Sequence, residues 1–324
     1  MLKVYITIDT EYSSGLVEGL SCFDRADNFA RSIACVTPDG PAGISHKLEL
    51  LERFGQKAVF FVDPMPALVW GVSAIEDVVG PIIAAGQDVQ LHLHTEWLEL
   101  AGKANPLRGR IGHNLADFSY DDQCELITFA RETLIAAGAP APVAFRAGNY
   151  GANDDTLRAL KAVGIGYDTS HCPGLESGHG RISLTPEDLL PVKHCGVVEV
   201  PVGSIGTSGG GQRHAQITAL SLREMTDAIR HARDNGRQEF TLVSHSFELI
   251  NRRKLAVNKV VRRRFEGLCR DLKKMRRVVT ANYRDDPPKV ATPHIEPELL
   301  PHDPIRAGLR MAEQVISNTL YGAL

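Results

Sequence analysis

Apolar positions along the chain follow two alternating patterns. Short apolar runs typical of β-strands are followed by stretches in which apolar residues recur every three or four positions, as in helices. The strand-like runs lie at 2–8, 57–62, 88–92, 143–146, 165–168, 197–201 and 240–244. Helix-like stretches lie between them at 45–54, 72–85, 120–137 and 154–163, and from residue 221. This alternation predicts a parallel sheet covered by helices.

The number of strand-like runs favours a closed or nearly closed (β/α) barrel over an open sheet. The first strand has no glycine-rich fingerprint after it, which argues against a dinucleotide-binding fold. Three long connections, 11–43, 171–186 and 203–216, are expected to form active-site loops. We expect the barrel over residues 1–284. A proline-rich tail with a helix at 305–319 follows over 285–324, and it either docks on the barrel or mediates association.

Carboxylates and imidazoles gather where two of these strands end. Asp9 and Glu11 end the first strand, and a two-residue side-chain period places them on one face. His92, His94 and Glu96 follow the third strand. His92 shares a face with His94 if the strand continues, or with Glu96 if the chain turns helical. Such a cluster can hold a divalent metal and leave one carboxylate free for proton transfer.

Further candidates follow other strand ends. Arg146 lies among small residues and could keep Asp9 ionised, while His245 ends the last strand and would face Asp9 across the barrel mouth. On the substrate side we place three residues. Trp97 could stack on a sugar ring, and Tyr150 and Asp168 follow the next two strands. The alternatives are a core aromatic for Trp97 and a turn cap for Asp168.

Bulk composition is that of an ordinary water-soluble protein. The chain has 324 residues, of which 43% are hydrophobic and 23% charged. Its first residues lead into a strand, without the pattern of a signal peptide, and no apolar stretch has the length of a membrane span. The six cysteines form no CxxC pair. These features lead us to expect a cytoplasmic protein with free thiols and no nucleic-acid partner.

Charge is unevenly distributed. Residues 252–277 contain twelve Lys and Arg residues against two acidic ones, although the whole chain has a net charge of −3. Apolar residues recur in this segment at helical spacing, which predicts a basic amphipathic helix. We interpret it first as a barrel helix with a cationic outer face. Peripheral contact with an anionic membrane is the alternative.

In this order the motifs at residues 9–11, 92–97, 145–151, 167–171 and 241–247 resemble those of the polysaccharide deacetylase superfamily, also called the NodB homology domain or carbohydrate esterase family 4. The resemblance covers about residues 1–250. Within the superfamily, the His-Leu-His-x-Glu-Trp form of the second motif is most similar to the WalW-like branch of lipopolysaccharide-biosynthesis proteins. The resemblance implies a distorted (β/α)7 barrel that hydrolyses N-acetyl groups of sugars with a divalent metal.

The resemblance also implies individual roles. Asp9 matches the catalytic base, Arg146 the residue that orients it, and His245 the general acid. The metal-binding aspartate of the first motif is replaced by Thr10, which leaves Glu11 as a substitute ligand.

In the second motif His92 matches the first metal ligand. Glu96 falls on the position of the second ligand, and His94 competes with it for that role. Zn²⁺ is the first choice of metal, and an N-acetylated sugar or glycan precursor of polysaccharide or lipopolysaccharide synthesis is the expected substrate. Two rivals remain open: a metal-independent hydrolase of a non-glycan amide, and an inactive glycan-binding protein.

Overall fold

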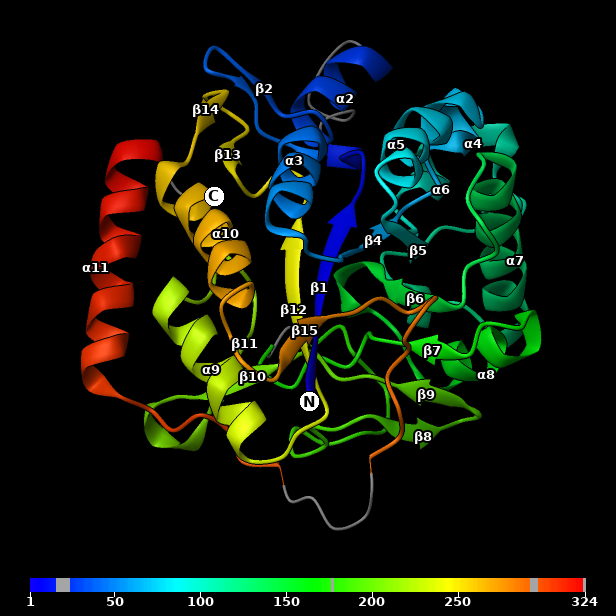
Figure 1. Cartoon of the computed structure of the whole chain (residues 1–324). Coiled ribbons are helices and arrows are strands. Elements are labelled where there is room, and N and C mark those ends of the chain that lie inside the picture. The colour runs from blue at the N-terminus through cyan, green and yellow to red at the C-terminus, as the bar shows by residue number, and fades with distance from the viewer. Residues whose placement is uncertain (16–23, 176–177, 292–296, 323–324) are drawn as a thin grey trace.

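The main sheet has the strand order β12–β1–β4–β5–β6–β7–β9–β8, and β15 also pairs with β1. The computed structural model describes residues 1–15, 24–175, 178–291 and 297–322 (Figure 1). Neighbouring strands are parallel except for the hairpin of β8 and β9. The strands are β1 (Leu2–Thr10), β4 (Val59–Val62), β5 (Asp88–Leu93), β6 (Ala144–Ala147), β7 (Tyr167–Asp168), β8 (Val192–His194), β9 (Val197–Glu199), β12 (Glu239–His245) and β15 (Val278–Thr280).

Helices follow the strands in the predicted alternation and cover the outside of the sheet (Figure 1). The longer ones are α3 (Ile44–Phe54), α5 (Ser73–Ala84), α7 (Tyr120–Ala136), α8 (Asp154–Val163), α9 (Leu222–Asp234), α10 (Lys259–Leu272) and α11 (Pro304–Tyr321). Shorter helices are α2 (Arg25–Ser32), α4 (Ala67–Trp70) and α6 (Trp97–Leu100). Among the described helices, none combines the length and the apolar character that crossing a bilayer requires.

The sheet curls into a distorted barrel. Segments without regular secondary structure close the gap beside β12. The backbone N–H groups of Gly203 and Ile217 donate to β12 carbonyls at 2.9 and 3.0 Å, on the edge of β12 away from β1. The chain that follows β9 enters the same gap after β9 has paired with β7. The predicted distorted (β/α) barrel with a C-terminal helix is therefore confirmed.

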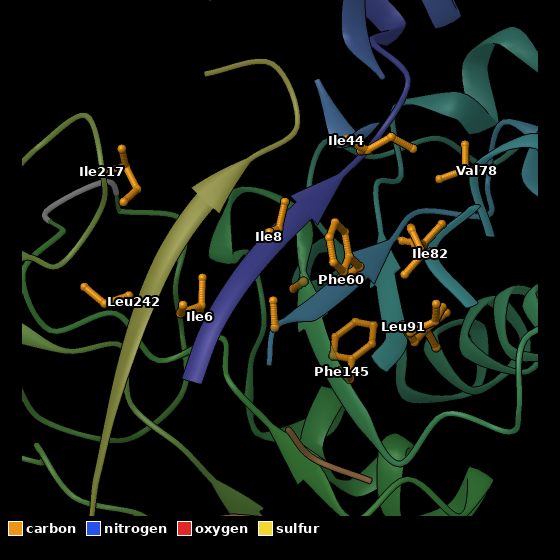
Figure 2. Close-up of a cluster of buried hydrophobic side chains, with 14 of the residues drawn as sticks. Ile6, Ile8, Ile44, Phe60, Val78, Ile82, Leu91, Phe145, Ile217 and Leu242 are labelled. Atoms are coloured by element: carbon orange, nitrogen blue, oxygen red, sulfur yellow. The ribbon is translucent and has the colours of Figure 1, made fainter. Parts of the chain in front are cut away.

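Side-chain alternation along β1 separates the two faces of the sheet. Ile6 and Ile8 point outward into the main core, where Phe60, Leu91 and Phe145 from neighbouring strands also pack (Figure 2). Tyr5, Thr7 and Asp9 alternate with them and face inward. Tyr5 belongs to a second, smaller cluster that fills the barrel with Val59, Phe61, Ala144, Val200, Ala281 and Tyr283. The inner face therefore carries aromatic packing at one end and polar chemistry at the other.

The long connections carry structure of their own. Residues 11–43 include α2 and the β2–β3 hairpin (Val36–Thr37, Gly40–Pro41), and 203–216 include the β10–β11 hairpin (Ser204–Gly206, Gln212–His214). Residues 16–23 and 176–177, which belong to two of the expected active-site loops, lie outside the described residues. A further hairpin, β13–β14 (Ile250–Asn251, Ala256–Val257), follows β12 directly.

The predicted basic helix at 252–277 is shorter in the structure: α10 (Lys259–Leu272) is a barrel helix, and the first residues of the segment belong to the β13–β14 hairpin. Val261, Phe265, Leu268 and Leu272 are buried toward the core, as the spacing of apolar residues predicts.

The tail returns across α9 and α10 as α11 (Figure 1). Among the cysteines in the described part of the chain, all are free thiols.

Candidate active site

Strand register brings the predicted residues to one end of the barrel. Asp9 on β1 is paired in register with His245 on β12, and His92 on β5 is paired with Arg146 on β6. Because these strands are parallel, their carboxyl ends lie at the same edge, where α/β barrels carry their active sites. Four residues separated by as much as 236 positions are thus brought into one neighbourhood.

Arg146 fixes the carboxylate of Asp9. Its Nη1 donates to Asp9 Oδ1 at 2.6 Å and to Thr7 Oγ1 at 2.9 Å, and its guanidinium lies 4.7 Å from the ring centroid of Phe61. Arg146 is fully buried and Asp9 is 2% exposed. Burial alone would lower the pKa of Arg146, but the charge of Asp9 raises it above its usual value. The hydrogen bonds of Arg146 therefore set the orientation of Asp9.

His245 lies between two carboxylates. Its Nε2 is 3.8 Å from Asp9 Oδ2, and its Nδ1 is 3.1 Å from Glu248 Oε1. Burial lowers the pKa of His245, but the hydrogen bond and charge of Glu248 outweigh burial and raise it to about 8. Burial in turn raises the pKa of Glu248, whereas His245 and Lys47 bring it down to about 2. We call Asp9, Arg146, His245 and Glu248 the acid–base group.

A buried lysine supports the backbone under His245. Lys47 on α3 donates from Nζ to Ser244 Oγ and to the carbonyl oxygen of His245, each at 2.6 Å. Burial lowers the pKa of Lys47 to about 8. The Lys47 ammonium thus fixes the end of β12 without reaching the pocket.

Glu11, His92 and His94 form a second group, which we call the ligand cluster. Glu11 Oε2 lies 3.1 Å from His92 Nε2 and 2.7 Å from His94 Nε2. One donor atom from each residue lies within 4.8 Å of the others. Burial raises the pKa of Glu11, but the two imidazoles lower it well below its usual value. The cluster therefore offers one carboxylate oxygen and two imidazole nitrogens to a single point.

Neighbouring groups orient both imidazoles. His92 Nδ1 lies 2.7 Å from the carbonyl oxygen of Arg146, which leaves Nε2 as the nitrogen that faces the cluster. His94 Nδ1 lies 3.1 Å from Glu96 Oε2, and Asn149 Nδ2 donates to Glu96 Oε1 at 2.8 Å. A hydrogen bond from the outer ring nitrogen to a carbonyl or carboxylate is the usual support of a metal-binding histidine.

The surroundings of the ligand cluster fit a divalent cation. Asp63 is buried near His94, and its Oδ2 has no hydrogen-bond partner among the described residues. Burial raises the pKa of Asp63 to about 7. A Cβ on Gly148 would come within 2.6 Å of His94 Nδ1, so glycine is needed beside this ring. Two imidazoles and a carboxylate are a ligand set that Zn²⁺ accepts, with a position left for a further ligand.

The structure distinguishes the candidates that the sequence left open. Thr10 Oγ1 donates to the carbonyl oxygen of Ile8 at 3.1 Å and does not belong to the cluster. His94 faces Glu11, while Glu96 contacts the far nitrogen of the His94 ring. In this arrangement Glu96 orients the His94 ring.

A pocket of about 260 Å³ opens over both groups. Tyr150 forms part of its wall, with its ring centroid 5.9 Å from the Arg146 guanidinium and a backbone φ of +56°. A bulky residue at positive φ is strained, and such strain is concentrated at functional sites. The lining residues are Asp9, Glu11, His92, His94, Ala147, Asn149, Tyr150, Leu175, His179 and His245.

Two of the expected substrate contacts need correction. Trp97 is fully buried, and its ring packs edge-on against Trp70 at 5.1 Å, so it is a core aromatic and does not wall the pocket. Asp168 is also fully buried. Its carboxylate accepts hydrogen bonds from the amide and hydroxyl of Ser170, and it lies beside Glu199. It supports the chain beneath the site.

Sequence reasoning missed three buried charged residues that support the site, Glu248, Lys47 and Asp63. Glu248 follows His245 by three positions, a spacing that could have suggested the contact. Asp63 follows the β4 strand directly, as Asp9 ends β1, and a search of every strand end would have included it. Lys47 gave no such signal, because it lies on the apolar side of a helix.

Known proteins of this architecture can now be compared. No family model matches the sequence, and no curated protein matches it significantly. Among solved structures, a Mycobacterium smegmatis protein assigned as a polysaccharide deacetylase aligns over 90% of this chain and 94% of its own, with 16% identity and a TM-score of 0.53. A family 4 carbohydrate esterase from Streptomyces lividans aligns over 93% and 98%, with 10% identity and a TM-score of 0.42.

A further match is the peptidoglycan deacetylase PdaC from Bacillus subtilis, which aligns over 98% of this chain and 96% of its own, with 10% identity and a TM-score of 0.37. The Mycobacterium smegmatis alignment shows that this chain has the fold of polysaccharide deacetylases. Assignment to the WalW-like branch stays a prediction.

Proposed function

We propose that this protein is a metal-dependent hydrolase that removes an N-acetyl group from a sugar or glycan precursor. The observation that carries the proposal is the opposition of Asp9 Oδ2 and His245 Nε2, 3.8 Å apart in one pocket with the ligand cluster. Arg146 orients the carboxylate of Asp9 through a hydrogen bond, and the charge of Glu248 favours the protonated form of His245. A base and an acid on either side of a reacting bond are what amide hydrolysis requires.

The reaction follows from these two roles. Asp9 accepts a proton from a water molecule while the water oxygen attacks the acetyl carbonyl carbon. The carbon–nitrogen bond then breaks as His245 donates its Nε2 proton to the leaving amine, and acetate and the free amino sugar are the products. Glu248 stabilises the imidazolium before transfer, because its carboxylate faces Nδ1.

Glu11, His92 and His94 would hold the cation, with Zn²⁺ as the first choice. A bound divalent ion polarises a carbonyl and lowers the pKa of bound water to about 7. The paired outer nitrogens of both imidazoles support this assignment, since they direct Nε2 of each ring toward Glu11. A role in polysaccharide or lipopolysaccharide synthesis and a cytoplasmic location remain part of the same proposal.

One observation favours a metal-free alternative. The charge of Glu11 raises the pKa of His94 well above its usual value, so a protonated imidazole could satisfy the carboxylate in place of a cation. The acid–base group needs no cation to be charge-balanced. A hydrolase of a non-glycan amide would then use Asp9 and His245 alone.

Acetate release tests the proposal. The protein is incubated with N-acetylated oligosaccharides, with and without added Zn²⁺, and an Asp9→Asn variant serves as the inactive reference. Zinc-stimulated acetate release that depends on Asp9 supports the metal-dependent deacetylase. Release that a chelator does not diminish favours the metal-free hydrolase, and binding without release favours a glycan-binding protein.

A further inference from the structure

A second pocket of about 540 Å³ lies against the outer side of the acid–base group. His245 lines both this space and the pocket over the ligand cluster, and Glu248 lines this space alone. Its far wall comes from the β13–β14 hairpin, whose loop begins with Arg252 and Arg253. We call this space the arginine pocket. It is lined by Gln216, Thr218, His245, Phe247, Glu248, Ile250, Asn251, Arg252 and Arg253.

Arg252 is held in a defined position. Its guanidinium lies 4.0 Å from the ring centroid of Phe247, and that ring lies 5.3 Å from the imidazole of His245. The aromatic ring covers one face of the guanidinium. The N–H donors lie on the edge of the guanidinium, which this contact does not cover. Within the described parts of the chain, neither Arg252 nor Arg253 forms a salt bridge.

The carboxylate that lines this pocket is already engaged. Glu248 accepts hydrogen bonds from Gln216 and Thr218 and contacts His245. In the described chain it forms no salt bridge with either arginine. A planar guanidinium edge binds carboxylate or phosphate in two-point geometry.

We propose that the arginine pocket binds an anionic group, phosphate or carboxylate, carried by the substrate sugar next to the acetylated position. This inference rests on the proposed function, because it places the anionic group beside His245. It narrows the substrate class from N-acetyl sugars in general to those that carry an acidic substituent.

Calorimetric titration tests the subsite without turnover. The Asp9→Asn protein is titrated with N-acetylglucosamine, N-acetylglucosamine 1-phosphate and N-acetylmuramic acid. We expect at least one charged sugar to bind about ten-fold more tightly than the neutral one, because hydrogen bonds between charged partners are the strong ones. Preference for the phosphate or for the carboxylate identifies the source of the anion.

Two variants complete the test. Arg252→Met keeps the aliphatic stem on Phe247 and should remove the preference. Arg263→Met removes the same charge from an exposed position on α10 and should preserve it. Equal affinity for charged and neutral sugars, or no binding of either charged sugar, would overturn the subsite. A binding preference that is intact while the wild type releases no acetate from any of these sugars would instead count against the deacetylase.

A different observation concerns α11. Its polar face packs on the barrel and its apolar face is exposed, which is the reverse of the usual arrangement. Four polar residues at helical spacing face the barrel. Arg306 contacts Asp227, Arg310 contacts Glu224, Glu313 contacts Arg264 and Ser317 contacts Asn258. Six large apolar side chains on the other side are 50–70% exposed, namely Ile305, Leu309, Met311, Val315, Ile316 and Leu320. An amphipathic helix on a barrel normally buries its apolar face.

The composition of this apolar face indicates what covers it. None of the exposed residues of α11 in the described chain is charged, so the face has no cations for an anionic membrane surface. Its apolar area is on the order of 400 Å², if each side chain contributes roughly 70 Å². A standard interface buries about 800 Å² per partner, of which a little over half is nonpolar. We propose that α11 docks against α11 of a second copy of this chain.

Analytical ultracentrifugation tests this interface on the whole protein. We expect a dimer for the wild type, and a monomer with an unchanged far-UV circular dichroism spectrum for Leu309→Lys and Ile316→Lys. Val279→Lys, at another exposed apolar position, should remain dimeric. A monomeric wild type would overturn the proposal, whether or not the protein binds neutral lipid vesicles. The proposal would also be overturned if both α11 variants remained dimeric.

Discussion

The acid–base group and the ligand cluster share one pocket but balance their charges differently. In the acid–base group each ion faces an opposite charge of the same chain: Arg146 faces Asp9, and Glu248 faces His245. The ligand cluster has Glu11, with Glu96 and Asp63 close by, around two imidazoles. Neutral imidazoles would leave this side with excess negative charge.

This difference indicates what each side needs from outside. Charge pairs in a buried site are satisfied only when both partners are present. The acid–base group supplies both partners itself, so its geometry is set by folding. The ligand cluster is completed either by protons on its imidazoles or by a cation. The predictions below disturb the two sides separately.

The largest effect is expected on removing the base. Asp9→Asn keeps the size of the side chain but cannot accept the water proton, so acetate release should fall by about 10²–10⁴. A steady-state assay measures the fall, with the exposed Asp234→Asn as control. Full turnover in the Asp9 variant would exclude Asp9 as the base.

Breaking the buried pair should cost stability. Arg146→Met leaves Asp9 in a buried site with no guanidinium, and the free energy of unfolding should fall by about 3–5 kcal/mol. Denaturant titration measures this change. Arg158→Met, which removes a surface ion pair with Asp155, should cost less than about 1 kcal/mol. Equal losses in the two variants would mean that the buried pair contributes no more than a surface one.

In the ligand cluster, the hydrogen bond between Glu96 and the His94 ring is expected to affect metal affinity. Glu96→Gln weakens the hydrogen bond that orients the ring, and Zn²⁺ affinity should fall about 10–100-fold. Competition with a chromogenic chelator measures the affinity, and Glu99→Gln, exposed on α6, is the matched control. An unchanged affinity would show that Glu96 does not orient a ligand.

The smallest expected effect is a shift in the pH dependence of activity, which tests the contact between His245 and Glu248. His245 must be protonated to donate, so activity should fall as pH rises through about 8. Glu248→Gln removes the charge that raises this pKa, and the decline should move toward about 6.5. At pH 8 the variant should therefore have about 6% of the wild-type activity, because about 3% of its His245 is protonated against about half in the wild type. An unmoved alkaline limb in the pH profile of kcat/KM would assign it to another group.

Strand positions could be predicted because each buried parallel strand is a short apolar run between turn residues. Asp9, His92, Arg146 and His245 were found for the same reason, since each occurs where such a run ends. Charge partners are harder to find. Lys47 is 198 residues from the carbonyl it binds, and no local pattern reports such a contact.

The wrong predictions for Trp97 and Asp168 have a different cause. Trp97 follows the second motif directly, but an aromatic residue gives the same signal whether its ring enters the core or the pocket. Asp168 ends a strand as Asp9 does, yet the Ser170 hydroxyl and amide satisfy its carboxylate below the pocket. Only the packing of the folded chain separates these cases.

Zinc titration tests the central claim most directly. The wild type and His92→Ala, both stripped of metal, are titrated with Zn²⁺ by calorimetry at pH 7. We predict about one zinc ion bound per wild-type chain, with proton release as the imidazole of His94 gives up its proton, and loss of this binding in His92→Ala. No zinc binding by the wild type, or equal binding by both proteins, would contradict this prediction.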